Sequence, residues 1–94
     1  MDKFKTAHKD KTIVIVEGER LTIGGINCFV FKEQYGFNIS HLETGMKMTD
    51  NKPTIHKALM VVKRNMKKHP DWLESGIKTL EKHGFKYPLN DPKK

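Results

Sequence analysis

The segment DNKPTIHKALMVVKRNMKKH, residues 50–69, decides how this chain folds. Counting 100° per residue places its main apolar side chains on one stripe of a helix: Ile55, Ala58, Leu59, Val62 and Met66. Pro53 suits the first turn of that helix, and Asp50, Asn51 or Thr54 can cap it. The segment therefore predicts an amphipathic helix over about residues 53–68, with its apolar stripe packed against a core.

The opposite face of this predicted helix is strongly basic. Residues 49–69 contain six lysine or arginine residues and one acidic residue, so they carry +5 of the chain's net charge of +7. Clustered cations gain affinity for nucleic acid by releasing counterions from phosphates, although lysines near a helix C-terminus also complement the helix dipole. The alternative is a merely solvated lysine-rich face. The residues that we predict to bind nucleic acid or another partner are Lys57, Lys63, Arg64, Lys67 and Lys68.

The region before the helix has the pattern of an antiparallel sheet. Thr12–Val16 is a continuous β-branched run. In residues 26–32 and 37–42, successive side chains are expected to alternate between the two faces of a strand. Polar or glycine-containing turns are predicted between these segments, at residues 17–20, 33–36 and 43–45, and Gly24-Gly25 predicts either a tight turn or a bulge. The short connections predict a meander of three strands, or four if residues 21–23 form a separate strand.

After the basic helix, His69-Pro70 predicts a break and then a second helix that ends before Gly84. The fold class that follows is α+β. A three- to four-stranded antiparallel meander, about residues 12–48, packs on the basic helix, about 53–68, and on a second short helix, about 71–82. We predict a flexible basic arm at residues 1–11, one domain at 12–89 and a flexible tail at 90–94.

The sequence lacks the residue patterns that enzymes and metal sites need. The five histidines are scattered, and none has a His or Cys three or four positions further on. Cys28 lies in an apolar strand, which predicts an inert core thiol, and the neighbours Ser40 and His41 point to opposite faces of a strand. We therefore expect no catalytic residues, no metal, no cofactor and no enzymatic activity.

The chain also lacks membrane and secretion signals. No apolar run approaches the ~18 residues of a membrane span, and the N-terminal residues do not resemble a signal peptide. The single cysteine excludes an internal disulfide and fits a reducing compartment. We therefore expect a cytoplasmic protein that does not bind membranes, because the apolar stripe of the helix is needed for the core.

One part of the chain resembles known proteins. Residues 35–45, YGFNISHLETG, lead into a Thr-x-x-Lys-Ala turn at residues 54–58. Over about residues 35–66 this resembles small uncharacterised proteins of bacteriophages and mobile elements, which show an aromatic-x-Val-Thr-His-x-x-Thr-Gly strand followed by a helix. The layout is also similar to that of integrase arm-binding and plant AP2-type DNA-binding domains. Their arginine-rich and tryptophan-bearing strands are missing here, which argues against binding through the sheet.

These observations leave two functions. The first is a non-enzymatic accessory protein, derived from a phage or mobile element, that binds nucleic acid through the basic helix face, with DNA favoured over RNA. The alternative is a phage-encoded inhibitor or modulator that acts in the host cytoplasm. Its basic face would dock on an acidic surface of a host protein, such as a defence nuclease or a nucleic-acid-processing enzyme. Strand Thr12–Val16 could pair with a second copy at a sheet edge, but a monomer is favoured over a homodimer.

Overall fold

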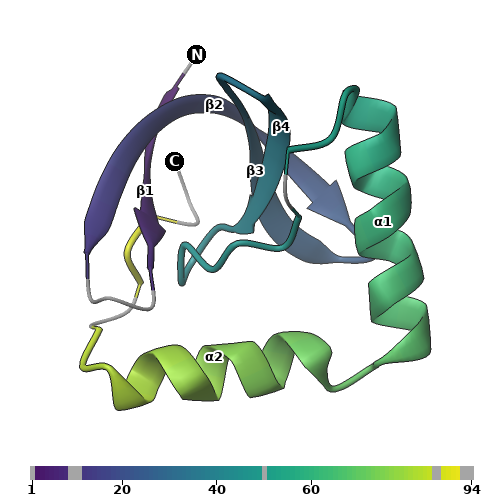
Figure 1. Ribbon diagram of the computed structural model, residues 1–94. Coiled ribbons are helices and arrows are strands. Elements are labelled where there is room, and N and C mark those ends of the chain that lie inside the picture. The colour runs from purple at the N-terminus through teal and green to yellow at the C-terminus, as the bar shows by residue number, and fades with distance from the viewer. Residues whose placement is uncertain (1, 9–11, 50, 86–87, 92–94) are drawn as a thin grey trace.

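The computed structural model describes residues 2–8, 12–49, 51–85 and 88–91. Four strands form one antiparallel sheet in the order β1-β2-β3-β4, and two helices follow (Figure 1). Their bounds are β1 (Asp2–Ala7), β2 (Ile13–Ile23), β3 (Ile26–Glu33), β4 (Gly36–His41), α1 (Ile55–Lys68) and α2 (Trp72–Lys82). The predicted α+β class, with a meander packed on two helices, is confirmed.

The first strand lies where the sequence predicted a flexible arm. β1 pairs with β2 along its whole length, from Asp2 opposite Gly18 to Ala7 opposite Ile13. Phe4 is only 2 % exposed and stacks on Phe29, with the ring centroids 4.6 Å apart. The prediction of a flexible arm is therefore wrong for residues 2–7, because a strand ladder and a buried aromatic pair hold them. Residues 9–11 lie outside the described part of the chain.

β2 is one long curved strand, so the turn predicted at residues 17–20 is wrong. Its first part pairs with β1 and its second part with β3, and Gly18 lies opposite both Asp2 and Phe31. A Cβ atom at Gly18 would collide with the carbonyl oxygen of Val30. Glycine therefore marks the point where two backbones approach closely, and Figure 1 shows β2 arching over the rest of the sheet. The predicted Gly24-Gly25 turn is confirmed, since both residues have positive φ and join β2 to β3.

The curved sheet buries side chains on both of its faces. Cys28 and Val30 of β3 face α1, whereas Phe29 and Phe31 face the opposite side, as the alternation predicted. The cluster next to α1 contains Ile23, Cys28, Val30, Ile39, Met48, Ala58 and Val62. The opposite cluster contains Phe4, Phe29, Phe31 and Leu42. The sheet is thus the central layer, with α1 on one face and the β1 end of the sheet folded over the other.

The two helices occupy nearly the predicted ranges. Thr54 is the N-cap of α1, and its Oγ1 accepts a hydrogen bond from the N–H of Lys57 at 3.1 Å. Gly84 follows α2 with a φ of 86°, and its N–H donates to the carbonyl of Glu81 at 3.0 Å, which confirms the predicted C-terminal turn. In Figure 1 the two helices lie along adjoining sides of the molecule. No helix in the described residues is long and apolar enough to cross a membrane.

The C-terminal segment returns to β1. Asn90 is 8 % exposed, and its side chain makes hydrogen bonds to the backbone of Lys5 and Leu42. The prediction of a flexible tail from residue 90 onward is therefore wrong at its first residue, because these bonds fix it. Residues 92–94 lie outside the part of the chain that the structure describes.

Candidate nucleic-acid interface

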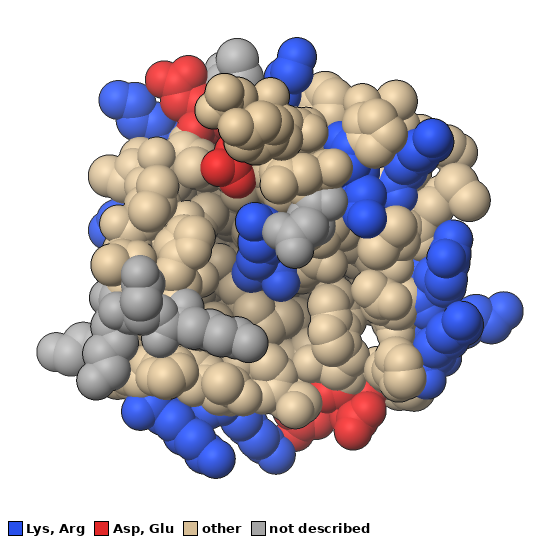
Figure 2. All heavy atoms as spheres, in the orientation of Figure 1, with Lys and Arg blue, Asp and Glu red and all other residues tan. Residues whose placement is uncertain are grey.

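The five predicted binding residues all lie exposed on α1. Lys57, Arg64 and Lys68 form a row along the helix, and Lys63 and Lys67 lie beside this row. The helix contains no acidic residue. Figure 2 shows basic side chains gathered over α1, at the right-hand edge of the molecule. We call these five residues and the surface between them the basic face.

The core holds the basic face in place. On the opposite side of α1, Ala58 and Val62 are fully buried and Leu59 is half-buried. Before the helix, Phe37 and Lys52 exchange two backbone hydrogen bonds of 2.8 and 2.9 Å, which fix the chain leading into α1. The cations are therefore carried by a helix whose position is fixed, and Lys57 and Lys68 are about 16 Å apart along its axis.

The cations of the basic face have no acidic partners among the described residues. The ion pair between Lys78 and Glu74, at 3.4 Å, lies on α2 instead, where both side chains are exposed. A group of cations without counter-charges produces a positive potential over one side of the molecule. The arrangement can therefore attract and hold a polyanion.

One apolar side chain interrupts the basic face. Met60 is 48 % exposed, and the neighbouring helical positions are occupied by His56, Lys57, Lys63 and Arg64. Methionine and arginine are enriched in protein–protein interfaces relative to the rest of the surface. The basic face thus offers one apolar contact in addition to charge.

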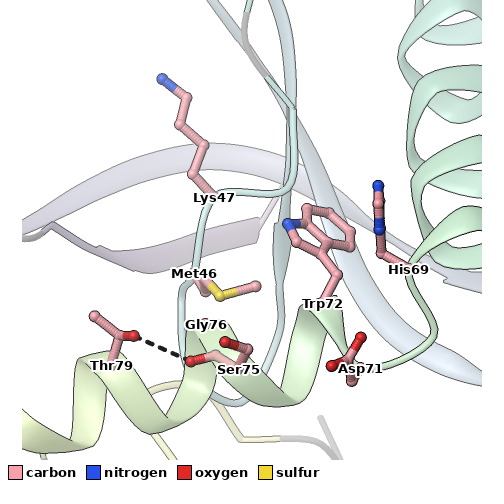
Figure 3. A pocket seen from close by; sticks show the side chains of 8 residues that line it. All are labelled: Met46, Lys47, His69, Asp71, Trp72, Ser75, Gly76 and Thr79. Carbon is pink, nitrogen blue, oxygen red and sulfur yellow. Dashed lines mark hydrogen bonds between the residues drawn. The ribbon is translucent and has the colours of Figure 1, made fainter.

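A cleft of about 490 Å³ lies beside the connection between α1 and α2 (Figure 3). Residues 46 and 47, which follow β4, form one wall. The other wall is formed by His69, by Asp71 at the N-cap of α2 and by residues of α2 itself. The lining of the cleft consists of Met46, Lys47, His69, Asp71, Trp72, Ser75, Gly76 and Thr79. The sequence predicted the helix over residues 71–82 but no site beside it. The available signal was the chain's single tryptophan beside His69-Pro70, but nothing local indicates that residues 46–47 face α2.

The cysteine thiol and the partly buried histidine are held inside the fold. Cys28 is fully buried, and burial raises the pKa of its thiol to about 11, so the thiol stays protonated as predicted for an inert core residue. Burial also lowers the pKa of His41, with an opposing effect from Glu43, and its Nδ1 lies 2.8 Å from Oγ1 of Thr44. Within the described residues, no three His, Cys, Asp or Glu side chains group in a way that could hold a metal ion.

Comparison with known proteins adds no further constraint. No family model, no curated protein and no solved structure matches the chain. The basic face of α1 and the cleft beside α2 are the surface features on which a function can be proposed.

Proposed function

We propose that this protein is a non-enzymatic accessory protein that binds nucleic acid, DNA in preference to RNA, through the basic face of α1. The observation that carries the proposal is that all five cations are exposed on a helix without an acidic residue, whose other side is anchored in the core. Such cations contact phosphates and position the protein on the strand without reading its sequence. The phage or mobile-element origin suggested by residues 35–66 is part of the same proposal.

The number of cations sets the expected salt dependence. If the basic face neutralises five phosphates, the slope of log K against log salt is about −4.5 for duplex DNA and about −3.5 for a single strand. Raising the salt from 50 to 200 mM then weakens single-strand binding by roughly 100-fold. Binding that is independent of base sequence and steeply dependent on salt is the expected signature.

The proposal is tested by titrating labelled duplex and single-stranded DNA with the protein and recording fluorescence anisotropy at these two salt concentrations. The double variant Lys57→Gln/Arg64→Gln should lower the magnitude of the salt slope by about 1.4 to 1.8. The matched control is Lys78→Gln/Lys82→Gln on α2, which removes the same charge from another helix. Equal losses in both variants would reject a role for the basic face, and no binding to either DNA at 50 mM salt would reject the proposed function.

The exposed Met60 favours a second candidate, a phage-encoded inhibitor or modulator that docks the basic face on an acidic surface of a host protein. The host protein would be a nuclease of a defence system or another nucleic-acid-processing enzyme. In this case Met60 would enter an apolar recess of the partner, surrounded by charge pairs.

Met60 separates the two candidates experimentally. Met60→Ala leaves all five cations in place, so DNA affinity should stay within about twofold, whereas docking on a protein should weaken by roughly 5- to 30-fold. The measurement is pull-down from host lysate followed by titration against the recovered protein. Failure to recover a stoichiometric partner that Met60→Ala weakens would count against the second candidate.

We propose that the protein acts as a monomer, because the side chain of Asn90 occupies the outer edge of β1 through two hydrogen bonds with Lys5. A second copy would have to use the other exposed edge, in β2. The first part of β2 pairs with β1 on one side, and no described strand pairs with residues 13–17 on the other side. Ile13, Val14 and Ile15 are exposed there, so this edge is where a second copy would bind. Light scattering during size-exclusion chromatography should give a mass near 10.9 kDa, and a mass of twice that value would contradict the proposal.

A further inference from the structure

We infer that the cleft beside α2 receives a nucleobase of single-stranded nucleic acid, by stacking on Trp72, while the phosphates on either side lie against α1. This inference rests on the proposed function and extends it, because it adds a contact to the base to the contacts with the backbone. The group that enters the cleft is the purine or pyrimidine ring alone, and the phosphates of the strand stay outside it.

The cleft combines an aromatic surface with several polar groups. Trp72 is half-buried, with one part packed on the core cluster and another part lining the cleft. Among the described residues, no hydrogen bond uses its indole N–H, the carboxylate of Asp71 or the hydroxyl of Ser75. In Figure 3 the indole nitrogen points into the space between α2 and residues 46–47. A flat ring entering the cleft thus meets an aromatic surface together with a hydrogen-bond donor and an acceptor.

The surface around the rings of His69 and Trp72 is hollowed on two sides. His69 and Trp72 line not only the 490 Å³ cleft but also an adjoining hollow of about 330 Å³, whose other walls include Ile26, Met66 and Leu73. A volume of a few hundred Å³ is typical of sites for small organic ligands. Aromatic side chains that solvent reaches in this way are what single-strand-binding proteins use to stack bases.

The charges favour a base rather than a phosphate inside the cleft. One cation, Lys47, and one anion, Asp71, line it, so it lacks the excess positive charge that a phosphate requires. Outside the cleft, Lys67 and Lys68 place positive charge in the last turn of α1 immediately before His69, whereas Glu74 of the adjoining hollow is paired with Lys78. A strand running along α1 can therefore keep its phosphates on the lysines and turn one base towards Trp72.

The fold explains why the cleft stays open. Gly76 of α2 faces Met46, and a Cβ atom at this position would collide with the Met46 sulfur. Glycine thus lets Met46 pack close to α2, and Trp72 lines the cleft nearer the start of the helix (Figure 3). The cleft is a feature of tertiary packing between two segments that are distant in sequence, residues 46–47 and residues 69–79.

The single tryptophan makes the test direct, because all tryptophan fluorescence comes from Trp72. The probes are a thymine dodecanucleotide and an abasic strand of equal length, which has the same phosphates and no bases. At 50 mM salt the thymine strand should quench Trp72 in a saturable way and bind about 5- to 100-fold more tightly than the abasic strand. Trp72→Leu should remove this difference between the strands and leave binding to the abasic strand unchanged.

A second variant guards against loss of folding in Trp72→Leu. Ser75→Leu narrows the cleft from the surface of α2 and keeps Trp72 and every charge in place, so it should also reduce the difference between the two strands. The control is Gln34→Leu, an exposed residue of the turn between β3 and β4, which should change nothing. Circular dichroism confirms that each variant is folded before it is used.

The outcomes separate this inference from the proposed function. Equal affinity for both strands with unchanged Trp72 fluorescence would overturn the inference and leave the proposed function standing. If neither strand binds, the proposed function fails, and free adenosine then tests the cleft alone: saturable quenching would support base binding, and its absence would overturn it. Quenching by a glutamate-rich decapeptide but not by the thymine strand would assign the cleft to a protein partner and would also overturn the inference.

Discussion

Asn90 and Lys5 are 85 residues apart in the sequence and exchange two hydrogen bonds. The N–H of Lys5 donates to Oδ1 of Asn90 at 2.7 Å, and Nδ2 of Asn90 donates to the carbonyl of Lys5 at 3.0 Å. The same amide nitrogen donates to the carbonyl of Leu42 at 2.7 Å. One side chain therefore occupies the outer edge of β1, where a further strand would otherwise pair, and connects both ends of the chain to the residue after β4.

Replacing Asn90 should destabilise the protein more than an ordinary polar substitution. Asn90→Ala removes three hydrogen bonds and leaves the N–H of Lys5 and the carbonyl of Leu42 without their partner, so we expect a loss of about 2–4 kcal/mol in the free energy of unfolding. Urea denaturation measures the change. The control is Gln34→Ala, which removes an exposed amide and should cost less than about 0.5 kcal/mol. Similar midpoints for the two variants would mean that Asn90 does not hold the edge of β1.

Gly18 and Gly25 should tolerate alanine differently. Gly18→Ala places a methyl group against the carbonyl of Val30 in the middle of the β2–β3 ladder, so we expect a loss of about 3 kcal/mol or an unfolded protein. Gly25→Ala meets no atom within 4 Å, and the cost of its φ of 82° is about 1–2 kcal/mol. Thermal denaturation of both variants gives the comparison. If the turn glycine proves the more costly to replace, β2 does not approach β3 as closely at residue 18 as the structure requires.

His41 should make the protein sensitive to mild acid. Burial lowers the pKa of His41 below its ordinary value of 6.5. Between the folded and unfolded pKa values the unfolded chain binds more protons, so stability falls as the pH drops below about 6.5 and continues to fall down to the folded pKa. Well above pH 6.5, where His41 is neutral in both the folded and the unfolded chain, it contributes no pH dependence.

The contribution of His41 can be isolated by difference. Unfolding free energies of the wild-type protein and of His41→Gln are measured by urea denaturation between pH 8 and pH 5, so that the other histidines cancel. The wild type should lose more stability than the variant below pH 6.5. Parallel pH profiles would show that His41 titrates alike in the folded and unfolded chain.

Cys28 should react only when the protein unfolds. Its side chain is fully buried and its thiol has a pKa of about 11, so at pH 8 the thiolate is on the order of 100-fold scarcer than for an ordinary cysteine. Labelling with a thiol reagent should therefore be slow in buffer and fast in denaturant. Because the chain contains one cysteine, the labelling rate reports on unfolding alone. Rapid labelling of the folded protein would contradict the position of Cys28 in the core.

Local patterns predicted α1 almost completely. The helical spacing of Ala58, Leu59, Val62 and Met66 identified the buried side, but Ile55 of the same predicted stripe is 41 % exposed, so the prediction was wrong for this residue. Of the three candidate N-caps, the structure confirms Thr54. This succeeded because helix formation depends on residues three or four positions apart, which the sequence displays directly. The exposure of the basic face followed from the same periodicity.

Distant contacts account for the predictions that were wrong. Residues 2–7 have one large apolar side chain, Phe4, and they form a strand only because β2 and Phe29 are there to receive them. Gly18 looks like a turn residue, but it serves as the close contact between β2 and β3. In both cases the decisive partner lies elsewhere in the chain, so no local pattern can reveal it.

Local periodicity, turn chemistry and composition were enough to predict the α+β class, the antiparallel meander, the two helices and the placement of the positive charge. Three features could be seen only in the folded molecule: β1 joins the sheet, Asn90 fixes the C-terminal segment, and Trp72, His69 and Lys47 line one cleft. They arise from packing between segments far apart in the chain, which no local pattern records. Their geometry is set by the curvature of β2 and by the close approach of residues 46–47 to α2.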